Sequence, residues 1–166
     1  MDNKWLRVSF ISQGTLAAYF QAVQWIPLGK WNYQPGLEPL LTQALGGTLG
    51  VKDVLLVALF TFPFFVFWIA WRNGWTWIVW IGVIGYLSWL SMELNTWWIA
   101  YIFGASDAWM SVYQRVFSQS TNFLPSSGRH LPPDALHVVL HILLFTIVFS
   151  TIFGLLKRHS VERQIT

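Results

Sequence analysis

The chain has 166 residues, of which 55% are hydrophobic and only 10% are charged, with a formal net charge of +3. A soluble domain usually carries about 25% charged residues, so this composition favours an integral membrane protein. Since the chain contains no cysteine, disulfides, thiolate metal sites and iron–sulfur clusters are excluded. The basic residues are scattered, which argues against a nucleic-acid partner.

Four long apolar segments predict an all-α polytopic membrane protein, because about 20 apolar residues cross the hydrocarbon core of a bilayer. The clearest signal is a pair of apolar runs joined by the short polar turn Arg72-Asn73-Gly74, which predicts a transmembrane helical hairpin. We expect one integral membrane domain over residues 1–166. The predicted transmembrane helices are residues 8–28, 53–71, 75–98 and 134–156.

The first predicted helix is the most polar, because it carries Gln13, Gln21 and Gln24. Lys4 and Arg7 precede it as in a signal peptide, but the apolar stretch is too long for a signal core, so we expect a retained helix. The next segment contains Pro63, which predicts a kink.

The third predicted helix contains Gly82 and Gly85, which would allow close approach of another helix. The fourth is predicted to begin after Pro132-Pro133 and to end at Lys157-Arg158.

Apolar residues at helical spacing also occur in both longer loops, residues 29–52 and 104–133. They predict a short interfacial helix in each loop. The first pattern comprises Leu37, Leu40, Leu41, Ala44 and Leu45; the second comprises Trp109, Val112, Tyr113, Val116 and Phe117.

The distribution of basic residues predicts that both termini are cytoplasmic. With that orientation, six Lys and Arg residues lie on the inner side and four on the outer side. A bacterial plasma membrane is the expected location.

Ionisable residues inside membrane helices are costly and usually face the bundle interior. Asp134, His137 and His141 are spaced i, i+3 and i+7, so they share one face of the fourth helix. Glu93 lies near the same end of the third helix, with Gln24 and Gln21 near that end of the first. Arg129 and His130, in the adjacent loop, are expected to cover this layer.

These residues allow three functional interpretations. Glu93, Asp134, His137 and His141 are candidate ligands of a divalent transition metal such as Zn, Cu, Fe or Mn. Glu93 with His137 is a candidate proton-transfer pair, for catalysis or transport. One histidine is a candidate axial haem ligand. The alternative is structural, with these side chains reaching the interface or bonding across helices.

Twelve tryptophans predict two interfacial belts, with a lipid-binding aromatic pocket as the alternative. Trp89, Trp97 and Trp98 are the candidate cofactor-binding or ligand-binding aromatics. The function expected first is binding of a lipid-like ligand, or a role as an accessory subunit of a membrane complex. A metal-dependent membrane enzyme or transporter is the second hypothesis. Expected partners are membrane lipid, other membrane subunits or a second copy of the chain.

Overall fold

The computed structural model describes residues 3–26, 28–31 and 49–165. Within these ranges the chain is all-α, with five helices if Thr76–Phe103 is counted as one, and no strand. The helices are α1 (Lys4–Trp25), α3 (Leu49–Arg72), α4 (Thr76–Glu93), α5 (Ala100–Phe103), α6 (Asp107–Val116) and α7 (Ala135–Ile165). A π-helical segment, η2 (Leu94–Ile99), joins α4 to α5, and a 3₁₀ turn, η1, spans Gly29–Trp31.

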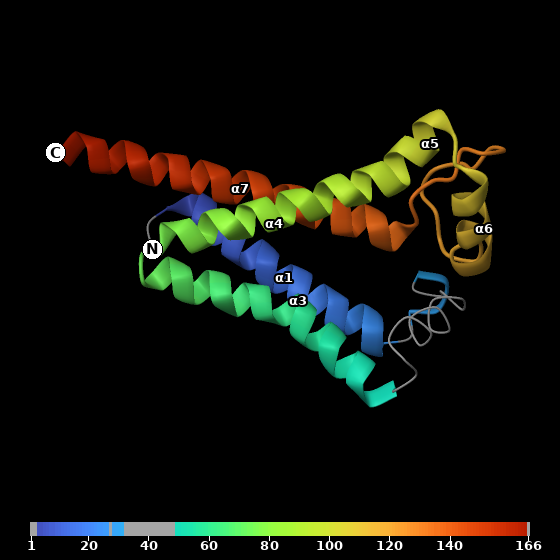
Figure 1. Cartoon of the computed structure of the whole chain (residues 1–166), viewed down its shortest axis with the longest axis horizontal. Helices are drawn as coiled ribbons and strands as arrows, with labels where there is room; N and C mark the ends of the chain where they lie inside the picture. The colour runs from blue at the N-terminus through green and yellow to red at the C-terminus, as the bar shows by residue number, and fades with distance from the viewer. Residues whose placement is uncertain (1–2, 27, 32–48, 166) are drawn as a thin grey trace.

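Four long helices, α1, α3, α4 and α7, run along the length of the molecule (Figure 1). The turn between α3 and α4 lies at one end, which we call the turn end, and α6 lies at the other, which we call the cap end. At the turn, Gly74 has φ +70°, a left-handed conformation that glycine adopts without strain. The predicted helical hairpin is therefore present, with its polar turn at residues 73–75.

Several predicted helix ends differ from the structure: α1 spans Lys4–Trp25 and not residues 8–28, and α3 begins at Leu49 and not at residue 53. The two largest differences are at C-terminal ends. The third helix does not end at Trp98 but continues through η2 to Phe103, where Gly104 ends it with φ +94°. The fourth does not end at residue 156 but extends to Ile165. Lysine and arginine are good helix formers, so Lys157-Arg158 can end an apolar span without ending the helix.

Buried polar side chains join α1 to α7, and these contacts account for Gln13 of the first predicted helix. Ser9 Oγ lies 2.5 Å from Thr151 Oγ1, and Gln13 Nε2 donates to Ser9 Oγ over 3.1 Å. Near the turn end, Asn3 Nδ2 donates to the Gly154 carbonyl over 2.9 Å. Gln13 is therefore part of a helix–helix contact and is not exposed to solvent.

Substitution of Gly154 is expected to weaken this contact. A Cβ at Gly154 would lie 2.6 Å from Leu6 Cδ2 and Cγ, and Leu6 is itself buried. We expect Gly154→Ala to destabilise the protein by about 1–3 kcal/mol, the usual cost of overpacking. Unfolding in mild detergent would measure the loss. Because Leu6→Ala removes the clashing atoms, the double variant should lose less than the sum of the two single losses.

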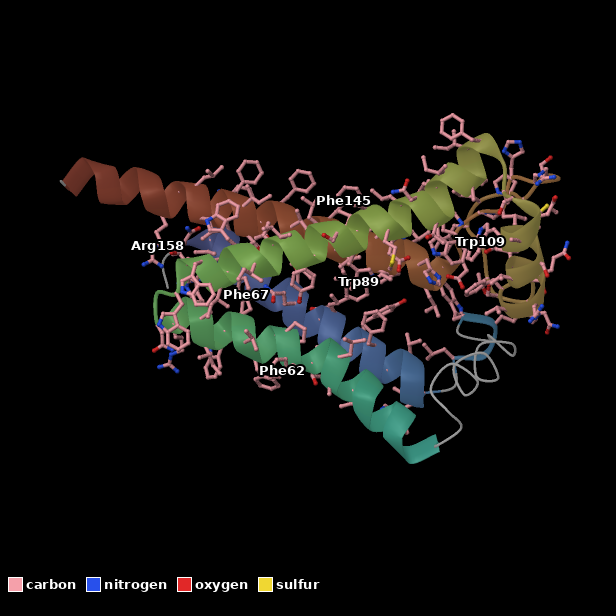
Figure 2. The ribbon with its side chains drawn as sticks, viewed as in Figure 1. Phe62, Phe67, Trp89, Trp109, Phe145 and Arg158 are labelled. Carbon is pink, nitrogen blue, oxygen red and sulfur yellow. The ribbon has the colours of Figure 1, made fainter. Side chains whose placement is uncertain are left out.

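Two helices, Thr76–Phe103 and Ala135–Arg158, are long and apolar enough to cross a membrane. Only 17% of the apolar window in the first is buried. Large apolar side chains on all four long helices are exposed, including Ile11, Phe62, Ile84 and Phe149. Figure 2 shows Phe62 of α3 pointing away from the bundle. A helix with so little of its apolar surface buried differs from the core helix of a soluble protein.

The two predicted loop helices have different outcomes. The periodicity of Trp109, Tyr113 and Phe117 is confirmed by α6, which Ser106 caps by accepting a hydrogen bond from the Trp109 amide over 3.2 Å. The pattern from Leu37 to Leu45 lies outside the described residues.

Candidate functional site

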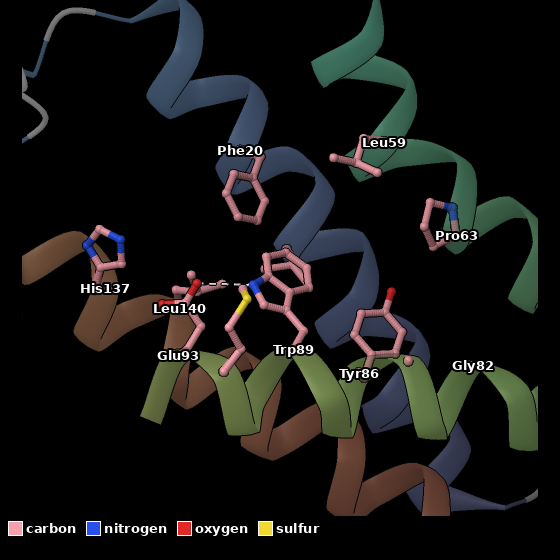
Figure 3. A pocket seen from close by; sticks show the side chains of 12 residues that line it. Phe20, Leu59, Pro63, Gly82, Tyr86, Trp89, Glu93, His137 and Leu140 are labelled. Atoms are coloured by element: carbon pink, nitrogen blue, oxygen red, sulfur yellow. Dashed lines mark hydrogen bonds between the residues drawn. The ribbon is translucent and has the colours of Figure 1, made fainter. Parts of the chain in front are cut away.

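A pocket of about 580 Å³ lies between the long helices, toward the cap end. Figure 3 shows Leu59 and Pro63 of α3 on one side of it, Tyr86 and Trp89 of α4 on the other, and Phe20 of α1 behind. Its lining is mostly apolar, and its volume is in the range of sites for drug-sized ligands, about 300–1,000 Å³. The described residues that line it are Leu16, Phe20, Leu59, Pro63, Gly82, Gly85, Tyr86, Trp89, Met92, Glu93, His137 and Leu140.

The pocket has a polar end formed by Glu93 and His137 (Figure 3), and the lining also includes the Tyr86 hydroxyl, which donates to Gln13 Oε1 over 3.4 Å. Trp89 Nε1 donates a hydrogen bond to Glu93 Oε1 over 3.1 Å, one turn along the same helix. The Glu93 side chain is 12% exposed. A mostly buried carboxylate therefore lies at the polar end, next to an apolar space.

His137 is oriented by Asp134, which is fully buried. Asp134 Oδ1 accepts from the His137 backbone amide over 2.9 Å and lies 2.6 Å from His137 Nδ1. The first contact is a helix N-cap, since α7 begins at Ala135. The second is the arrangement in which a carboxylate fixes the tautomer of an imidazole, as in general-base sites. Asp134 thus caps the N-terminus of α7 and also positions His137, which lines the pocket.

His141 lies one turn further along α7, between Trp98 and Glu93. Trp98 Nε1 lies 3.1 Å from His141 Nδ1. Because an indole N–H can only donate, His141 Nδ1 must accept and the ring proton must be on Nε2. Nε2 lies 3.6 Å from Glu93 Oε2 and has no hydrogen-bond partner among the described residues. Both oxygens of Glu93 therefore face N–H groups, which stabilises the ionised carboxylate.

The Trp98→Phe variant tests this tautomer assignment. Without the indole donor, His141 Nδ1 becomes a buried acceptor that has lost its hydrogen-bond donor. This loss should lower the free energy of unfolding by about 1–3 kcal/mol. We expect ¹⁵N NMR of labelled histidine to show His141 as the Nε2–H tautomer in the parent chain and a changed tautomer signal in the variant. An Nδ1–H tautomer in the parent chain would contradict the assignment.

Trp97 lies in an aromatic cluster under α6 and contributes to the packing of the cap end. Its ring centroid is 4.1 Å from that of His137 and 4.9 Å from that of Phe117. Tyr113 belongs to the same cluster. Burial raises the pKa of the Tyr113 phenol, an effect that the hydrogen bond from Asn122 partly offsets.

The structure brings together only part of the predicted site. Glu93, Asp134, His137 and His141 lie at the cap end, and Trp89 lines the pocket, whereas Trp97 and Trp98 are absent from its described lining. Gln21 accepts a hydrogen bond from Trp25 at the exposed end of α1. The side chain of Gln24 lies outside the described residues.

The loop residues predicted to cover the site have other contacts. Arg129 pairs with Asp107 over 2.8 Å, and its Nε donates to the Ala105 carbonyl over 2.8 Å. His130 Nδ1 lies 2.8 Å from the Tyr101 carbonyl oxygen. These contacts attach the loop to α5 and to the start of α6.

The predicted metal site gains no support from the geometry. In the described part of the chain, no three His, Asp or Glu residues are grouped so that they could hold a metal ion. His141 is also poorly prepared as a ligand, because the bond from Trp98 places the ring proton on Nε2. The metal site stays a prediction.

Sequence reasoning missed most of the apolar lining, including Phe20, Leu59 and Pro63. The sequence predicts Gly82 and Gly85 at a contact with another helix, and in the structure both line the pocket. A Cβ at Gly85 would meet nothing within 4 Å in the described structure. The sequence signal for the pocket was the pair of glycines on one side of α4. Because glycine has no side chain, such a pair permits either close contact with another helix or an open space.

No protein-family model matches this chain, and neither the curated proteins nor the solved structures include a similar one.

Proposed function

We propose that this protein is an integral membrane helical bundle that binds a lipid-like ligand in the pocket between α1, α3, α4 and α7. The observation that carries the proposal is the pocket itself, whose apolar walls end at Glu93 and His137. An apolar space with a few convergent polar groups is the usual form of a small-molecule site. Leu59, on the pocket wall, is 63% exposed, so the pocket opens toward the surroundings of the bundle.

In the proposed membrane arrangement, α1, α3, α4 to α5, and α7 span the bilayer. The exposed apolar side chains on all four helices would then face lipid. Tryptophans near the turn end support an interface there, because Arg72 lies over Trp68 at 5.3 Å and Arg158 over Trp71 at 5.4 Å. We place the turn end and both termini in the bacterial cytoplasm, and α6 on the outer surface.

Single cysteines test the arrangement, because the chain has none of its own. Asn73, at the turn end, and Ser126, at the cap end, are both exposed. In intact cells, we expect a membrane-impermeant maleimide to label Ser126→Cys but not Asn73→Cys. Permeabilised cells should show labelling of both. Labelling of both variants in intact cells would contradict the four-span arrangement.

The binding proposal is tested with tritium-labelled hexadecanol and the protein in phosphatidylcholine nanodiscs. The expected result is one saturable site per chain, after correction for partition into empty nanodiscs. Hexadecanol has an apolar chain and a small hydroxyl head, which match the apolar walls and the polar end at Glu93 and His137. Uptake that does not saturate, equal to that of empty nanodiscs, would overturn the proposal.

A further inference from the structure

The polar end of the pocket has a defined charge sign. Glu93 and His137 are the acidic and basic side chains of the described lining, and no lysine or arginine is among the described lining residues. Glu93 faces the Trp89 indole and His141, and in this geometry His141 Nδ1 accepts the Trp98 hydrogen bond and therefore carries no proton. Trp89 and His141 thus present N–H groups to the Glu93 carboxylate.

His137 does not reverse this sign. It is paired with the buried Asp134 at 2.6 Å. If the imidazole is protonated, the pair has no net charge, and if the imidazole is neutral, the pair is negative. With Glu93 added, the polar end is negative in both cases.

The cap-end basic residues whose side chains the structure describes do not offset this charge. Arg129 is engaged by Asp107 and by the Ala105 carbonyl. Lys30 and Arg115 are exposed, and neither is part of the described pocket lining. A negative head group in the pocket would thus lie near Glu93 with no lysine or arginine among the described lining residues, and like charges in close contact repel.

We infer that the pocket selects amphiphiles whose head donates hydrogen bonds and has no negative charge, such as long-chain amines and alcohols, and that it excludes anionic amphiphiles. This inference rests on the proposed function. Glu93 Oε2 is the principal acceptor for such a head, because Oε1 already accepts from Trp89 and Oε2 lies 3.6 Å from His141. A charge-assisted hydrogen bond to the head would supply the discrimination.

Competition against tritium-labelled hexadecanol tests the inference, with hexadecylamine and hexadecyl sulfate as competitors in phosphatidylcholine nanodiscs. The two share one chain and differ in the head group. After correction for partition into empty nanodiscs, hexadecylamine should compete at least about tenfold better than hexadecyl sulfate, since bonds to charged groups contribute about 1.5–3 kcal/mol. Equal competition, or stronger competition by the sulfate, would overturn the inference while leaving the binding function intact.

The Glu93→Gln variant assigns the selection to this carboxylate. The amide keeps an oxygen that can accept from Trp89, so the variant should unfold in mild detergent as the parent chain does, and this measurement is the control for a folded protein. The preference for the amine should fall at least about fivefold, because the charge-assisted bond is lost. A preference that persists while hexadecanol still binds would overturn the role of Glu93. Absence of saturable hexadecanol binding in the parent chain would instead overturn the proposed function, and the inference with it.

Discussion

Replacing Asp134 with alanine is expected to destabilise the protein by about 2–4 kcal/mol, among the largest losses available to a single substitution. Loss of a helix N-cap costs about 1 kcal/mol, and a hydrogen bond to a charged group contributes about 1.5–3 kcal/mol. Asp134 supplies both, because its Oδ1 accepts from the His137 amide and contacts His137 Nδ1. Unfolding monitored by tryptophan fluorescence in mild detergent would measure the loss.

Asp134→Asn is the matched control for this variant. Asparagine caps helices as well as aspartate, so the bond to the His137 amide is retained. Only the charge facing the imidazole is lost, and we expect a loss of about 1–2 kcal/mol. Ordinary surface substitutions change the free energy of unfolding by less than about 0.5 kcal/mol. If both variants were within that range of the parent chain, the Asp134–His137 contact would not stabilise the cap end.

Replacing Gly85 with leucine is expected to abolish ligand binding without unfolding the bundle. Gly85 lines the pocket, and a Cβ there would meet nothing within 4 Å in the described structure. The longer side chain would therefore extend into the space that the ligand occupies. Overlap of this kind costs about 1–3 kcal/mol, so hexadecanol affinity should fall at least about tenfold. The same nanodisc binding measurement gives the result.

The Gly85→Leu variant should lose affinity for the ligand without losing stability. Glycine inside a helix is less favourable than other residues by about 1 kcal/mol, so Gly85→Leu should be as stable as the parent chain or more so. Ser88→Leu is the matched control, because Ser88 is exposed on the same helix and is not part of the described pocket lining. Ser88→Leu should bind hexadecanol normally. Equal affinity in both leucine variants would place the ligand elsewhere.

The sequence predicted those features that depend on local pattern. Two apolar runs around Arg72-Asn73-Gly74 predicted the hairpin, and the spacing of Asp134 and His137 predicted a shared helix face, which their hydrogen bond confirms. These predictions succeed because side-chain direction in a helix follows directly from its period.

The pocket could not be predicted, because it depends on how the helices lie relative to one another. Phe20, Leu59 and Pro63 are ordinary apolar residues of two separate predicted segments, and their convergence is a tertiary property. The partners of Trp98 and Trp97 were also beyond prediction. Both lie in the π-helical segment η2, where consecutive residues contact His141 and His137.

The central claim is that a lipid-like ligand occupies the pocket and is not merely adsorbed on the apolar exterior. Photo-crosslinking with a hexadecanol analogue that carries a diazirine in its chain, followed by peptide mapping in nanodiscs, tests this claim most directly. We expect label on the pocket residues Phe20, Leu59 and Trp89, and we expect excess hexadecanol to compete it away. Label spread over exposed side chains such as Ile142 and Phe149 of α7, unaffected by competitor, would contradict the claim.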